Sequence, residues 1–135
     1  MAHPFHPFTQ EHFIAVVIGF AAVAAFLMAG KKGGDSRKRA AVVLAFINLL
    51  SFPLSLAAWY TVDAPKSLDN FLPLQLCDVA TFTAGLALLT KRPLLCALTY
   101  FWGLAATMQA LLTPAISVGF PEFAFIVFFV QHFAI

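Results

Sequence analysis

The chain has 135 residues, of which 61% are hydrophobic and 10% are charged, and its mean hydropathy is +0.89. A soluble domain of this length could not bury so much apolar surface, whereas a lipid bilayer provides the burial. The net charge of +2 is small, and five of the eight basic residues lie within Lys31–Arg39. Because no aromatic side chains separate them, this segment indicates membrane topology and no nucleic-acid partner.

The sequence predicts five helical segments, since a bilayer leaves apolar runs no other way to pair their backbone groups. Four are long enough to cross a membrane and lie at about residues 9–29, 41–62, 72–89 and 94–113. The fifth, residues 121–135, covers about 22 Å of a hydrocarbon core about 30 Å thick and carries no polar flank. The predicted fold is all-α: a polytopic transmembrane helix bundle with four full spans and a truncated fifth. We expect the natural chain to be longer, with further helices.

Local signals mark the first two spans. Thr9 is a candidate N-cap, and Glu11 falls in the first turn, where the helix dipole favours an anion. Pro53 lies inside the second span and removes one backbone hydrogen bond, so we expect a kink there. Ser51 or Ser55 is placed to cover the carbonyl groups that the kink loosens.

The basic residues predict the orientation of the chain. The loops after the first and third spans hold seven of the eight, and Lys66 is the remaining one. We expect residues 30–39 to form the first of these loops. By the positive-inside rule, both basic loops are cytoplasmic and the N-terminus is extracytoplasmic. The expected location is the cell membrane, crossed several times.

Polar residues inside spans are the first place to look for chemistry, because a membrane makes them costly. Asp78 is the only acid well inside a predicted span, and a central Asp costs roughly 2.5–3.5 kcal/mol. It should face a protein interior or a wet cavity, and it needs a partner. Gln75, Asp78 and Thr81 repeat every three residues and share a helix face. The alternative is that these side chains only hold neighbouring helices together.

Further polar residues fall at a similar depth. Gln109 in the fourth span lies near the level of Asp78, because the fourth span ends on the side where the third begins. Thr107 is offset from Gln109 by roughly 160° around that helix. We therefore predict one interior pocket, with His132 on its inner side, lined by Gln75, Cys77, Asp78 and Gln109.

His132 is the remaining reactive group near this pocket. It lies eleven residues after Pro121, roughly 16 Å down a straight helix, whereas Cys77 lies about 6 Å past Pro73. Straight helices place the two at different depths, which counts against direct contact, although helix tilt or a raised start to the fifth span would reduce the gap. A lone histidine in a helix is also more often structural than catalytic.

Two cysteines inside apolar segments indicate buried thiols and no disulfide. Cys77 lies in the early turns of a helix, whose positive end favours a thiolate, and a histidine could act as its base. Cys96 has only apolar neighbours, and we interpret it as packing. His3 and His6 lack a fixed scaffold, so we predict no metal site and no cofactor.

Several stretches carry a resemblance to a known family. The sequences FTQEH at 8–12, LPLQLCDVATF at 72–82, YFWGLAATMQALLTP at 100–114 and QH at 131–132 resemble YwaF-type bacterial integral membrane proteins. Those proteins typically have six or seven spans, and this chain departs from them by ending soon after His132. The family is similar to eukaryotic transmembrane acyltransferases that move fatty acyl chains between phospholipids through a cysteine.

The resemblance implies a role for each residue of the predicted pocket. Cys77 would be the acyl-accepting nucleophile and His132 its base, while Gln75, Asp78 and Gln109 would bind and orient the substrate or stabilise the oxyanion. Membrane lipids would then be the partners. Two other functions fit the residues alone: a small ion-coupled transporter that uses Asp78 as its relay, and a structural membrane protein without enzymatic activity.

Overall fold

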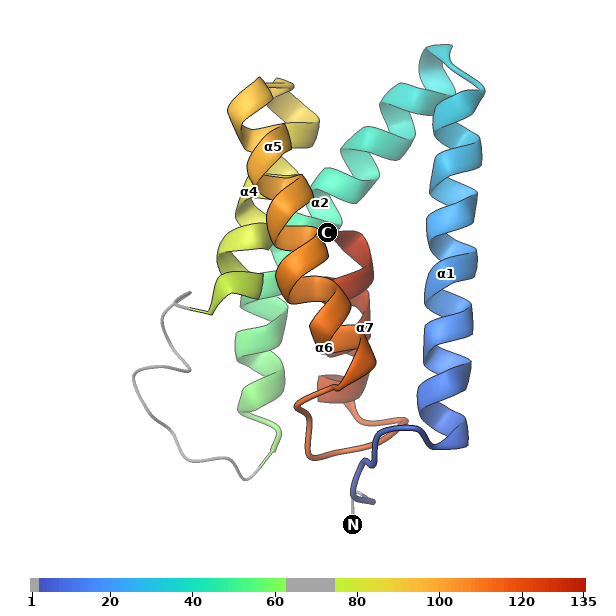
Figure 1. The fold of residues 1–135 in the computed structure, drawn as a ribbon, viewed down its shortest axis with the longest axis vertical. Helices are drawn as coiled ribbons and strands as arrows, with labels where there is room; N and C mark the ends of the chain where they lie inside the picture. Colours follow the sequence, from blue (N-terminus) through green and yellow to red (C-terminus); the bar gives the residue numbers. More distant parts are fainter. Residues whose placement is uncertain (1–2, 63–74) are drawn as a thin grey trace.

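The computed structural model describes residues 3–62 and 75–135. Every regular element in these residues is helical, which confirms the predicted all-α class. Figure 1 shows the helices as a bundle in which α1 stands at one side. The elements are α1 (Gln10–Lys31), α2 (Gly34–Trp59), α4 (Leu76–Thr90), α5 (Pro93–Trp102), the π-helical turn η1 (Gly103–Thr107), α6 (Met108–Leu112) and α7 (Phe123–Ala134).

Three helices are long and apolar enough to cross a bilayer. They are α1, α2 and the continuous helix Pro93–Leu112, which joins α5, η1 and α6. The described part of the expected third span is the 15-residue α4, and the fifth is the 12-residue α7. Four full spans and a truncated fifth are therefore not confirmed, although three such helices support a multi-pass membrane protein.

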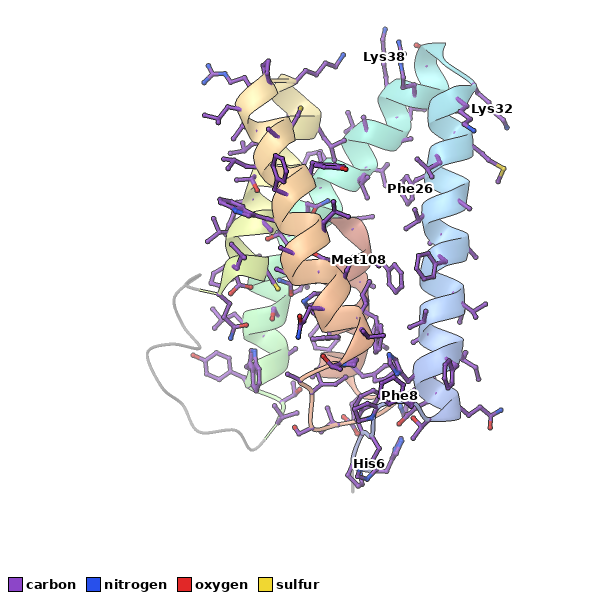
Figure 2. All side chains as sticks on the ribbon, viewed as in Figure 1. His6, Phe8, Phe26, Lys32, Lys38 and Met108 are labelled. Carbon is purple, nitrogen blue, oxygen red and sulfur yellow. The ribbon has the colours of Figure 1, made fainter. Side chains whose placement is uncertain are left out.

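The start of α2 differs from the prediction. Helix α2 begins at Gly34, so most of the expected loop at residues 30–39 is helical. Gly33 makes the turn after α1 with φ 73°, a conformation that glycine adopts without steric cost. Asp35 lies in the first turn, where the helix dipole favours a negative charge. Hydropathy alone missed these residues because the helix extends past its apolar part. Figure 2 shows Lys32 and Lys38 at one end of the molecule and His6 and Phe8 at the other.

Helix α2 bends, as its proline predicts. In Figure 1 its first half runs obliquely and its second half upright. Pro53 cannot donate to the carbonyl of Leu49 one turn earlier, so the helix is weakened there. Of the two candidate serines, Ser51 makes a backbone bond in this region, from its hydroxyl to the Ile47 carbonyl at 2.7 Å.

Helix α7 is the centre of the packing. It contacts α1, α2, α4 and α6, and half of its residues are buried. Only His12 and Gly19 are buried in α1, and many of its large apolar side chains are exposed on a face suited to lipid. At Gly19 the ring of Phe133 lies where a Cβ atom would be, so this glycine lets α1 approach α7 closely.

The N-terminal tail closes one end of the bundle. Phe5 is 5% exposed and packs with Leu111, Phe125 and Phe129 in the main apolar core. The tail also pairs with the loop before α7, through a bond from the Phe5 amide to the Ser117 carbonyl at 3.2 Å. We call Phe5, His12, Leu111, Phe125 and Phe129 the tail cluster.

Candidate functional site at the junction of α4 and α7

Asp78 has the partner that its position demands. It lies in the first turn of α4, and its Oδ1 accepts a hydrogen bond of 3.0 Å from Nε2 of Gln131 near the end of α7. Gln131 is only 4% exposed. Gln131 had no predicted role, although it is a polar residue in an apolar run, beside His132. We call Cys77, Asp78, Gln131 and His132 the α4–α7 junction.

This contact overturns the depth expected from straight helices. Asp78 follows Cys77 in the chain, and its partner Gln131 precedes His132. Cys77 and His132 therefore lie at a similar depth in the bundle. The first turn of α4 lies beside the last turns of α7, so the two helices do not start at the same level, as the straight-helix argument assumed. Figure 1 shows the start of α4 and the end of α7 at mid-height in the bundle.

The hydrogen bond of His132 defines its tautomer. Its Nδ1 lies 2.7 Å from the Phe128 carbonyl, which can only accept, so we assign the proton of the neutral ring to Nδ1. The lone pair of Nε2 is then available, and the described residues give it no hydrogen-bond partner. The ring is 6% exposed and lies 4.2 Å from the ring of Phe128, centroid to centroid. A fixed imidazole with a free Nε2 has the form of a general base.

Cys77 is half-buried in the first turn of α4. The positive end of the helix dipole lies there, at the position on which the sequence argument for a thiolate rested. The described structure contains no hydrogen bond between this thiol and the His132 ring. The structure therefore brings the two chain segments together through Asp78 and Gln131, and not through the cysteine and histidine themselves. Cys96 is exposed on α5 and takes no part in the junction.

The other two predicted pocket residues lie elsewhere. Gln75 is exposed and precedes α4 with extended backbone angles, so its spacing of three from Asp78 does not place it on the same helix face. Gln109 is exposed on α6, whereas Thr107 is buried. This agrees with the offset of roughly 160° expected between them, so the prediction had turned the wrong face of this helix inward. The four residues therefore do not form one interior pocket.

Other buried polar groups hold the helices together. Nδ2 of Asn48 donates to the carbonyls of Leu44 at 2.9 Å and Ala134 at 2.8 Å, linking α2 to α7. The Thr81 hydroxyl donates to the Asp78 carbonyl at 2.7 Å. Two buried oxygens in the described residues lack partners, Oδ1 of Asn48 and Oγ1 of Thr107. Asn48 thus links two helices, whereas the Thr81 bond stays within α4.

A cavity of about 50 Å³ reaches the junction. This volume holds a few water molecules or a short piece of an alkyl chain. Its wall is mostly apolar, and Gln131 is part of it. Among the described residues, no three His, Cys, Asp or Glu side chains are grouped to hold a metal. The cavity is lined by Ser55, Ala58, Trp59, Val62, Ile116, Ser117, Val118, Ala124, Val127, Phe128 and Gln131.

Comparison with known proteins gives one match. The profile of the TMEM164 family matches residues 7–135, which include the whole α4–α7 junction. The chain belongs to the TMEM164 family. This is a transmembrane protein family, so the match agrees with the apolar helices. No curated protein and no solved structure matches the chain. The resemblance to YwaF-type proteins and to acyltransferases stays a prediction.

Proposed function

We propose that this TMEM164-family protein is a YwaF-type membrane enzyme that transfers fatty acyl chains between phospholipids through Cys77. The observation that supports this most is the 3.0 Å bond between Gln131 and Asp78. The bond joins Asp78, which follows Cys77 at the start of α4, to Gln131, which precedes His132 in α7. A nucleophile and a base on separate elements, held together by a third contact, are the parts that covalent acyl transfer needs.

The reaction has two balanced steps. Nε2 of His132 takes the proton of the Cys77 thiol, and the thiolate attacks an ester carbonyl of a phospholipid. The ester C–O bond breaks, the lysophospholipid oxygen receives the proton, and a thioester remains on Cys77. A second lysophospholipid hydroxyl then gives its proton to His132 and attacks the thioester, which restores the thiol. The thiol and imidazole draw together in the substrate complex, where catalytic hydrogen bonds tighten.

The remaining predicted residues take roles that suit their positions. The Gln75 amide, exposed at the start of α4, is a candidate donor to the oxyanion. Asp78 orients the first turn of α4, because its carboxylate accepts from Gln131. Gln109 is a candidate contact for a lipid headgroup from α6. Membrane lipids are the proposed partners, and they enter from the bilayer beside the junction.

Substitution of Cys77 tests this function. Purified protein in mixed micelles receives a phospholipid with a labelled acyl chain and an unlabelled lysophospholipid. Cys77→Ser should lower transfer by roughly 10³-fold or more, because a hydroxyl is a far weaker nucleophile without a strong base. Cys96→Ser is the matched control and should keep full activity. A hydroxylamine-sensitive acyl group on Cys77 is expected by mass spectrometry. Full transfer by Cys77→Ser would contradict the proposal.

One observation favours a second function, ion-coupled transport. Asp78 is an acid within an apolar helix, and its partner Gln131 lines the cavity. Such acids mark proton or ion relays in many membrane proteins. Flux into liposomes that depends on Asp78, without a thioester on Cys77, would support this alternative. If neither is found, the polar residues are structural.

We also propose that the N-terminus is extracytoplasmic and that the protein lies in the cell membrane. The support is the gathering of basic residues at the α1–α2 and α4–α5 turns, which have the charge of cytoplasmic loops. Ser36→Cys, in a background without the native cysteines, should resist an impermeant maleimide in intact cells and react after permeabilisation. Labelling of this cysteine in intact cells would show the opposite orientation and contradict the proposal.

A further inference from the structure

We infer that Gln131 is a positioning residue, which holds α7 against the first turn of α4 so that His132 stays within reach of Cys77. The inference deepens the proposed function and rests on it. Gln131 had no predicted task before its contact with Asp78 was seen.

The surroundings of Gln131 show that its amide is there for a specific contact. The side chain is 4% exposed on a helix whose other residues near it are aromatic or aliphatic. A buried amide is costly unless its hydrogen bonds are made, and an apolar residue would pack here without that cost. Its Nε2 instead donates to Oδ1 of Asp78 at 3.0 Å, a charge-assisted bond when the carboxylate is ionised.

The packing of α7 makes this bond important for its position. Helix α7 lies mainly against α2 and α1, and its direct contact with α4 is small. The bond between Gln131 and Asp78 is the side-chain hydrogen bond that the described structure contains between α4 and α7. Without it, little besides apolar packing, which has no fixed direction, would set the distance between the two helices.

Two restraints in series then determine where the base lies. The bond from Nδ1 of His132 to the Phe128 carbonyl fixes the ring on α7. The bond between Gln131 and Asp78 fixes α7 on α4. Cys77 precedes Asp78 in the same helical turn, so the second bond also sets the separation of thiol and imidazole. A misplacement of 1 Å in such a pair lowers a rate by about 10²-fold.

The test compares Gln131→Met with a swapped pair. Methionine keeps the length of glutamine but cannot donate, whereas Gln131→Glu combined with Asp78→Asn restores an amide–carboxylate bond in the reverse sense. Gln131→Met should lower kcat for acyl transfer by roughly 10- to 100-fold and leave KM within about 2-fold. The swapped pair should recover most of this loss. Gln10→Met, at the exposed start of α1, is the matched control and should behave as wild type.

A second readout does not depend on acyl transfer. In a Cys96→Ala background, the rate of Cys77 alkylation at neutral pH reports how well the base assists the thiol. Gln131→Met should slow alkylation as much as His132→Gln does, and the swapped pair should restore it. Mere loosening of the structure would expose the thiol and speed alkylation, which would overturn the inference.

The two readouts separate this inference from the proposed function. If wild type transfers no acyl chain but alkylation still depends on Gln131, the positioning role stands and the acyltransferase proposal fails. If transfer occurs and Gln131→Met changes neither kcat nor alkylation, the enzyme stands and the positioning role is overturned. Should Gln131→Met not fold, the swapped pair decides: it must exceed Gln131→Glu alone in both readouts, or the inference falls.

Discussion

The two buried histidines of this chain lie in regions of opposite character. His12, in the tail cluster, is 3% exposed and has both ring nitrogens bonded. Its Nδ1 accepts from the Phe8 amide at 3.0 Å, and its Nε2 donates to the Leu111 carbonyl at 2.9 Å. His132, in the α4–α7 junction, is 6% exposed, and within the described residues only its Nδ1 is hydrogen-bonded.

The two histidines differ in how many of their ring nitrogens are hydrogen-bonded, which separates a structural role from the proposed role as a base. An amide can only donate and a carbonyl can only accept, so His12 is held as the neutral tautomer with its proton on Nε2, and no lone pair remains. Phenylalanine rings enclose it, with Phe5 and Phe129 at 5.8 and 5.9 Å between centroids. His132 keeps a lone pair and lies beside a thiol-bearing helix. The completed hydrogen bonds of His12 fit a structural role, and the open Nε2 of His132 fits the base that we propose.

Parallel substitution of the two histidines is the strongest way to break this comparison. His132→Gln should lower acyl transfer by roughly 10²- to 10⁴-fold, the usual contribution of a general base. His12→Gln should leave transfer nearly unchanged and instead lower the free energy of unfolding by about 1–3 kcal/mol, because the oxygen and nitrogen of glutamine do not coincide with the two ring nitrogens that bind the amide and the carbonyl. Initial rates in mixed micelles and thermal unfolding in detergent measure the two effects.

The opposite pattern would contradict this reading of the two sites. If His12→Gln abolished transfer in a protein of unchanged stability, the tail cluster would hold the chemistry. If His132→Gln changed stability alone, the α4–α7 junction would be structural.

The sequence predicted those features that depend on apolar runs and on the cost of an isolated charge. The helical class, the three long helices and the need of Asp78 for a partner follow from such arguments. The partner itself could not be predicted, because a residue in α7 meets Asp78 only once the helix starts are known. Gln75 was placed wrongly because regular helical geometry was assumed for a residue that precedes α4. Gln109 was placed wrongly because residue spacing does not say which face of a helix turns inward, and the structure exposes it.

The tail cluster was underestimated from sequence for a different physical reason. The tail carries too few apolar residues to predict a helix, so periodicity gave it no role. Its position depends on a contact over a long sequence separation, between Phe5 and the loop before α7. Glu11 adds a second link, since its carboxylate accepts from the Phe120 amide at 3.1 Å. The predicted N-cap Thr9 lies at the right position, but its hydroxyl donates to the His6 carbonyl and accepts no hydrogen bond from the helix amides.

Substitution of the two tail phenylalanines tests whether the tail cluster is structural. The expected effect is on stability and is smaller than the effect of His132→Gln on activity. Phe5 is 5% exposed in the tail cluster, whereas Phe8, three residues on, is 60% exposed. Phe5→Ala should lower the free energy of unfolding by about 3 kcal/mol, because it leaves a cavity among Leu111, Phe125 and Phe129. Phe8→Ala should change it by less than about 1 kcal/mol. Thermal unfolding in detergent measures both, and limited proteolysis should cut the tail faster only in Phe5→Ala. Equal losses for the two variants would show that the tail does not anchor this end of the bundle.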